Sequence, residues 1–142
     1  MTIAGFNLKK ILVERKSTLQ GELRIDTKTN ITDIKKEELK LIQGKEAINF
    51  SFNFSIHYLS AKNQSEAAEI SFEGEVIYIA DSKDSKKIID DWKKKEIDEK
   101  IRIQILNTIL LKCNLKSLLL EDELGLPPHL PLPRLKPEEK KK

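Results

Sequence analysis

The sequence predicts an α+β domain: an antiparallel four-stranded sheet with a long crossover loop, followed by two helices packed on one face. Apolar residues recur at every second position through much of residues 6–80, which is the period of strands. Over residues 84–124 they recur at every third or fourth position, which is the period of helices. The 142 residues suit one domain, expected over 1–135, with a charged, disordered tail over 136–142.

The first two strands are predicted at residues 6–16 and 19–25. Apolar residues of the first strand are Phe6, Leu8, Ile11 and Val13. Their spacing slips between Leu8 and Ile11, which predicts a β-bulge. A short turn at Ser17 and Thr18 is expected before the second strand. That strand has an alternating face made by Leu19, Gly21, Leu23 and Ile25.

A long polar connection is predicted at Asp26–Glu46. Structureless loops of this length are uncommon inside a compact domain and tend to be functional. Its apolar residues are expected to dock on another surface, and a short helix near Asp33–Ile42 is an alternative. These residues are Ile31, Ile34, Leu39, Leu41 and Ile42.

The third and fourth strands give the clearest alternation, at residues 48–59 and 69–79. The third strand has an apolar face of Phe50, Phe52, Phe54, Ile56 and Tyr58. Ser51, Asn53, Ser55 and His57 form its opposite face. In the fourth strand, Ile70, Phe72, Val76 and Tyr78 share one face around Gly74, whereas Ile77 and Ile79 face the other way.

Two helices follow. Asp84 or Ser85 can cap the first, whose apolar stripe is Ile88, Ile89 and Trp92. The second helix is predicted to begin at Asp98 and to end at Gly125, a natural C-cap. Its apolar residues include Ile101, Ile105, Ile109 and Cys113, with Ile103 and Leu111 widening the stripe. A helix that is apolar on more than one side is expected to pack twice, against the sheet and against another subunit.

The charge pattern argues against nucleic acid as a partner. Charged residues make up 35% of the chain, but the net charge is only +3 and the signs are interleaved. Lysine dominates, whereas phosphate recognition favours arginine forks as well. The N-terminus lacks a signal-peptide core, and no apolar run is expected to cross a membrane. With one cysteine there is no intrachain disulfide, so a cytoplasmic location is expected.

The residues offer no enzymatic motif. Cys113 lies on an apolar helical stripe, where an inert buried cysteine is expected. Nothing in the sequence ties His57 or His129 to it. The acidic run Glu121–Glu123 is expected to be a solvated helix face. Neither a catalytic group, a metal site nor a cofactor is predicted.

Two segments have alternative interpretations. The phenylalanine ladder of residues 50–54 is either ordinary core beneath a helix or an aromatic platform. The serine and asparagine residues between the phenylalanines disfavour RNA and leave peptide binding open. Residues 125–133, rich in proline and leucine and here called the strap, are expected to pack over the core. The alternative is a proline-rich ligand for a partner's aromatic groove.

Several runs together resemble the SecB family of export chaperones, especially its archaeal and toxin–antitoxin-associated relatives. The connection at Asp26–Glu46 matches the place of that family's crossover loop. The runs are Phe6-Asn7-Leu8-Lys9-Lys10-Ile11, Glu69-Ile70-Ser71-Phe72-Glu73-Gly74, Ile105-Leu106-Asn107 onward, and Gly125-Leu126-Pro127-Pro128-His129-Leu130-Pro131-Leu132-Pro133.

The resemblance implies a homotetramer, built as a dimer of dimers, that binds unfolded polypeptides in apolar grooves without ATP. Export chaperones of the family have an acidic C-terminal region that contacts the translocase motor. This chain ends in Glu138–Lys142 without net acidity, which puts docking to that motor in doubt. An adaptor or antitoxin-specific chaperone and a basic oligomeric RNA-binding domain are alternative functions.

Two sets of site residues are predicted on this basis. Residues expected to bind the client are Leu39, Leu41, Ile42, Phe50, Phe52, Tyr58, Leu126 and Leu130. Residues expected at the oligomer interface are Ile70, Phe72, Ile101, Ile105 and Ile109.

Overall fold

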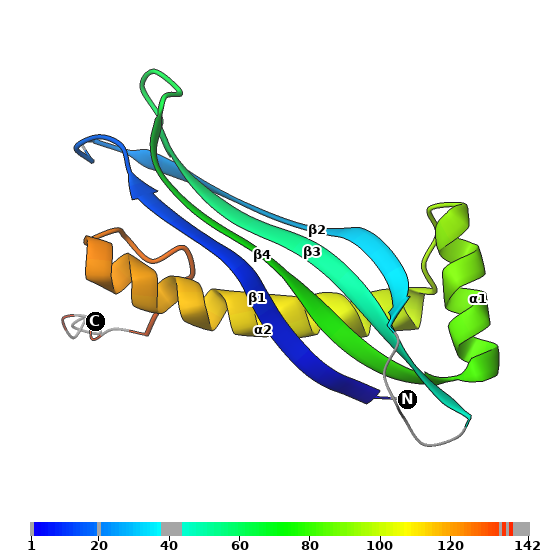
Figure 1. Cartoon of the computed structure of the whole chain (residues 1–142). Coiled ribbons are helices and arrows are strands. Elements are labelled where there is room, and N and C mark those ends of the chain that lie inside the picture. The colour runs from blue at the N-terminus through cyan, green and yellow to red at the C-terminus, as the bar shows by residue number, and fades with distance from the viewer. Residues whose placement is uncertain (1, 20, 38–43, 134, 136, 138–142) are drawn as a thin grey trace, which may run out of the picture.

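The computed structural model describes residues 2–19, 21–37, 44–133, 135 and 137. Along the chain the elements are β1 (Thr2–Arg15), β2 (Leu23–Glu37), β3 (Lys45–Ser60), β4 (Glu66–Asp81), α1 (Ser82–Lys93) and α2 (Glu99–Leu124). The four strands form one antiparallel sheet in the order β1-β4-β3-β2, and α2 runs across it (Figure 1). The predicted α+β fold, a four-stranded antiparallel sheet followed by two helices, is confirmed.

The predicted β-bulge in the first strand is present. Leu8 pairs with Gly74 and Lys10 pairs with Glu73, so Lys9 is the inserted residue. Gly74 pairs with Leu8 beside this bulge, where there is no room for a side chain. A Cβ at position 74 would lie 2.4 Å from the Asn7 carbonyl oxygen and 2.9 Å from the Phe52 ring. The glycine that interrupts the alternation of β4 therefore allows two neighbouring strands and a core ring to approach.

The second strand corrects the sequence-based prediction. Residues 26–37 are not a loop or a helix, because β2 pairs with β3 from Leu23 to Glu37. β2 is a polar edge strand. Apolar–polar alternation is difficult to recognise in its sequence because its helix-facing positions include Thr27 and Thr29. The crossover between the two edge strands is instead made by the segment between β1 and β2. Its described residues, 16–19 and 21–22, lie outside the strands.

One face of the sheet packs against both helices and holds the core. Paired residues of neighbouring strands point to the same face, so Phe54 and Phe72 stack with their centroids 5.9 Å apart. Phe6 and Phe52 stack at 5.4 Å. The indole nitrogen of Trp92 in α1 donates to Asp33 of β2 at 3.2 Å. Helix α1 begins at Ser82, earlier than Asp84 or Ser85 would place it.

Helix α2 has two opposed rows of side chains. The buried ridge is Ile105, Ile109, Cys113, Ser117 and Glu121, spaced by four residues and packed under the sheet. The exposed ridge, on the opposite side, is Ile103, Leu111, Leu115 and Leu119, each 48–65% exposed. Two apolar ridges on opposite sides leave little overall amphipathicity. They indicate a helix that packs on its own sheet and presents a second apolar surface.

Helix α2 is also long and apolar enough to cross a membrane, judged by length and composition alone, with a window of mean hydropathy 1.3. No membrane-crossing run is expected from the sequence. The apolar character of α2 comes from both the buried ridge and the exposed ridge. One such helix is weak support for a membrane span.

Candidate functional site

The predicted client-binding residues of β3 lie in the core. Phe50, Phe52 and Tyr58 point toward the helices and none exposes more than 1% of its surface. They do not line an open groove, so the prediction is corrected: the ladder is core beneath a helix. Period-2 alternation identifies a covered face but does not tell whether the cover is the chain's own helix or a client. Leu39, Leu41 and Ile42 lie outside the described residues.

Four of the predicted interface residues are also in the core. Ile70, Phe72, Ile105 and Ile109 are completely buried between the sheet and α2. A second copy of the chain cannot reach them, so their assignment to an interface is corrected. Ile101 is partly buried and packs against the same core. The surface that α2 leaves free is the exposed ridge, whose members Ile103 and Leu111 the sequence indicates as widening the apolar stripe and whose members Leu115 and Leu119 it indicates as continuing it.

The strap is attached to the end of α2. Gly125 adopts a left-handed conformation with φ of 66°, which confirms the predicted C-cap. The Leu126 amide donates to the Glu121 carbonyl at 2.9 Å, and the Arg15 guanidinium donates to the Leu124 carbonyl at 2.9 Å. Leu126 is 5% exposed and joins the core, whereas Leu130 and Leu132 are 37% and 52% exposed. The strap is thus buried at its start and apolar but open at its end.

A buried polar cluster lies beneath the strap. The Glu121 carboxylate accepts hydrogen bonds from the Tyr58 hydroxyl and from the His129 backbone amide, the latter at 3.0 Å. His129 Nδ1 lies 3.0 Å from both Glu121 carboxylate oxygens, and its Nε2 lies 2.8 Å from Asn114 Oδ1. The Tyr58 hydroxyl is also 3.0 Å from the Pro127 carbonyl oxygen. These contacts tie β3, α2 and the strap together.

The burial of this cluster has electrostatic consequences. The side chains of Glu121 and His129 are each only 1% exposed. Burial, and then the adjacent Glu121 carboxylate, raise the pKa of the Tyr58 hydroxyl far above its usual value, so it remains a hydrogen-bond donor. The prediction that Glu121 belongs to a solvated acidic face is therefore wrong. Position 121 continues the four-residue spacing of the buried ridge, and that spacing was the available signal.

The opposite face of the sheet has a second histidine–carboxylate cluster. His57, Glu66 and Glu69 place possible ligand atoms within 4.8 Å of one another. Lys16 Nζ contacts the Glu66 carboxylate and lies 3.7 Å from that of Glu69, so an ammonium already supplies a cation there. Although burial opposes it, hydrogen bonds from Lys16 and His57 lower the pKa of Glu66. The arrangement is an ion-pair network on the sheet surface.

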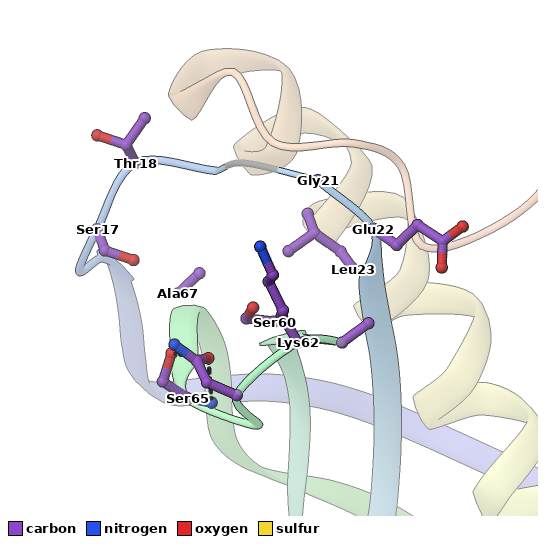
Figure 2. A pocket seen from close by; sticks show the side chains of 11 residues that line it. Ser17, Thr18, Gly21, Glu22, Leu23, Ser60, Lys62, Ser65 and Ala67 are labelled. Carbon is purple, nitrogen blue, oxygen red and sulfur yellow. Dashed lines mark hydrogen bonds between the residues drawn. The ribbon is translucent and has the colours of Figure 1, made fainter.

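A cavity of about 680 Å³ lies at the same end of the sheet. Figure 2 shows Lys62 pointing from the β3–β4 turn into the space below Thr18 and Gly21 of the crossover. Backbone bonds close this end: the Lys16 amide donates to the Ala67 carbonyl at 2.8 Å, and the Ala61 amide donates to the Glu22 carbonyl at 3.0 Å. The cavity is open and its lining mixes polar and apolar groups, in contrast to the apolar surface of α2 and the strap.

Cys113 is a core residue, as predicted. It lies in the buried ridge, and burial raises the pKa of its thiol to about 12. A thiol with so high a pKa is protonated at neutral pH and is a poor nucleophile.

Comparison with known proteins adds one finding. No family model matches the chain, and no curated protein matches it. A solved structure that resembles it is a SecB-like chaperone from Mycobacterium tuberculosis, in complex with a ChAD peptide from the HigA1 antitoxin. The TM-score is 0.54 with 13% sequence identity, over 97% of this chain and 92% of the other. The chain therefore has a SecB-like fold.

Proposed function

We propose that the chain is an ATP-independent chaperone, acting in the cytoplasm, that holds non-native polypeptides on exposed apolar surface. The SecB-like fold supports this proposal, as does the peptide bound to the structurally similar chaperone. The observation that carries it is the pair of open leucines in the strap, Leu130 and Leu132. Exposed apolar patches that are contiguous mark interaction sites in soluble proteins.

The exposed ridge suits contact with a second copy of the chain. Exposed charged residues near the start of α2 are Glu99, Lys100 and Arg102, and those near its end are Asp122 and Glu123. Two copies of α2 packed antiparallel would place Lys100 and Arg102 of one copy beside the acidic end of the other and bury both ridges. We propose this pairing as one contact of a homotetramer, a dimer of dimers.

The remaining open leucines suit a client. Leu130 and Leu132 project from an extended, proline-rich backbone. Each apolar client side chain buried there would contribute about 1.5–3 kcal/mol, and repetition over several subunits would add avidity. Leu39, Leu41 and Ile42 remain predicted client residues. A single dedicated partner, such as an antitoxin, would use the same surface.

Sedimentation tests the subunit contact. Leu111→Asp with Leu115→Asp should dissociate the assembly at micromolar concentration, because two carboxylates would be desolvated at the interface. Lys112→Asp with Lys116→Asp is the control, since it places the same two carboxylates on the same helix beside the ridge, with a larger change in net charge. A wild-type monomer at micromolar concentration would refute the proposed assembly.

A binding panel tests the chaperone proposal against its rivals. The panel contains an unfolded protein, the same protein folded, and RNA, each at two salt concentrations without ATP. The proposal predicts binding of the unfolded protein alone with little salt dependence. Strong salt-dependent RNA binding would indicate a nucleic-acid-binding domain instead. Binding of one folded partner but no unfolded chain would indicate an adaptor.

A further inference from the structure

The strap makes its polar attachments at very few points. Pro127, Pro128, Pro131 and Pro133 have no amide hydrogen to donate. In the described part of the strap beyond Gly125, hydrogen bonds are donated by the amides of Leu126 and His129, both to Glu121, and by the His129 ring. The Pro127 carbonyl oxygen accepts one from the Tyr58 hydroxyl. Residues 130–133 are exposed. Attachment of the strap thus depends on one apolar anchor, Leu126, and on polar contacts at Pro127 and His129.

The His129 anchor is a buried histidine–carboxylate contact. The His129 ring lies between two side chains, with the Glu121 carboxylate at Nδ1 and the Asn114 amide at Nε2. A ring N–H at Nδ1 donates to the Glu121 carboxylate, three residues after Leu126 in the chain. Removal of the ring would deprive a buried carboxylate of a donor, which is unfavourable.

The space that the strap occupies has the chemical features of a peptide-binding site. It offers an apolar position, filled by Leu126, and a cluster of acceptors made by Glu121 and Asn114. A segment that fits must be extended and must supply a large aliphatic side chain. It must also place a side-chain N–H donor about three residues later. The strap has this pattern in Leu126 and His129.

We propose that this site is a client-binding site and that the strap is its internal occupant, which an unfolded client displaces. The inference rests on the proposed chaperone function and deepens it. It assigns a preferred client segment, an aliphatic residue followed three residues later by one with a side-chain N–H donor. It also gives Tyr58 a place in client binding, since the Tyr58 hydroxyl contacts both Glu121 and the Pro127 carbonyl oxygen of the strap.

A synthetic strap peptide tests the site without any unfolded client. The peptide has the sequence of residues 125–133. His129→Gln in the full chain replaces the imidazole that contacts Glu121 and Asn114, so the strap should leave more often and the peptide should bind about tenfold tighter than to wild type, the effect of one charge-assisted hydrogen bond. His57→Gln, the same change in the surface cluster, should bind the peptide as wild type does. A peptide with glutamate in place of histidine should not bind.

Equal peptide affinity for wild type and His129→Gln, or equal affinity of the two peptides, would overturn the proposal. If His129→Gln fails to fold, the wild-type chain still decides. A saturating unfolded client should accelerate hydrogen exchange of the Leu126 amide and shift the His129 imidazole resonances. A client that binds without changing either signal would overturn the inference while leaving the chaperone function intact. Failure of every unfolded client to bind would instead refute the chaperone function.

Discussion

The two ridges of α2 have similar spacing and opposite surroundings. Ile105, Ile109 and Cys113 are completely buried under the sheet, whereas Leu111 and Leu115 on the other side are 60% and 57% exposed. The buried ridge ends in polar residues, Ser117 and Glu121, and the exposed ridge stays leucine to Leu119. Apolar character alone therefore does not identify the core of this protein. The outward leucines have no role in the fold of one chain, and we assign them to association.

Thiol chemistry gives the largest expected difference between the ridges. At pH 8 the thiolate fraction of Cys113, with a pKa of about 12, should be about a thousandfold smaller than that of an unperturbed thiol. Native wild type should therefore resist an aromatic disulfide reagent. Leu115→Cys should gain one fast-reacting thiol at high dilution, and its reaction should slow as concentration rises. Rapid labelling of native Cys113 would show that the ridge containing Cys113 is not the one packed against the sheet.

Truncating a side chain should lower the free energy of unfolding more on the buried ridge than on the exposed ridge. Ile109→Ala should cost about 2–5 kcal/mol, because it leaves a cavity in the core. Leu115→Ala should change the stability of the monomer by less than about 0.5 kcal/mol, as surface substitutions do. Urea denaturation measures the free energy of unfolding of both variants, at a protein concentration low enough for the assembly to be dissociated. Similar losses for the two variants would contradict the assignment.

The polar end of the buried ridge can be tested through Tyr58. Tyr58→Phe should cost about 1–3 kcal/mol, because Glu121 loses a buried donor. Tyr78→Phe is the control, since Tyr78 is similarly buried on the adjacent strand. The raised pKa of Tyr58 means that its contribution is complete below about pH 10 and is lost as the pH rises above that value, where the unfolded chain ionises. Wild type should lose stability there more steeply than Tyr58→Phe.

The smallest effect concerns the charges beside the exposed ridge. Arg102→Glu should weaken self-association by about 1 kcal/mol or less, as expected for an exposed ion pair. Combination with Glu123→Arg should restore it if the two helices pack antiparallel. Sedimentation of the single and double variants measures the coupling. Two independent losses without rescue would exclude that pairing.

How well the sequence predicts each strand depends on how clearly apolar and polar residues alternate between its two faces. The third strand is clear because its phenylalanines alternate with serine and asparagine over residues 50–55. The second strand was missed beyond Ile25, because its helix-facing positions include Thr27 and Thr29 at the edge of the sheet. The bulge beside Leu8 was visible as a slip in spacing, since an inserted residue shifts every following side chain.

The candidate site was harder to predict than the fold. Alternation showed that Phe50 and Phe52 are covered, but not that α2 covers them. The contacts of Glu121 join residues 58, 114 and 129, and no local pattern encodes such distant pairs. Continuing the four-residue spacing from Ile105 reaches Glu121 and would have marked it as buried. The partner of that carboxylate becomes evident only once the strap is placed.

Suppression of aggregation tests the central claim most directly. The chain should prevent aggregation of a chemically unfolded protein without ATP, and Leu130→Asp with Leu132→Asp should abolish this while leaving the fold and assembly intact. Leu135→Asp, the same change at an exposed leucine beyond the strap, is the control and should retain activity. Loss with the double variant alone is the predicted result. Full protection by the double variant, or no protection by wild type, would contradict the account.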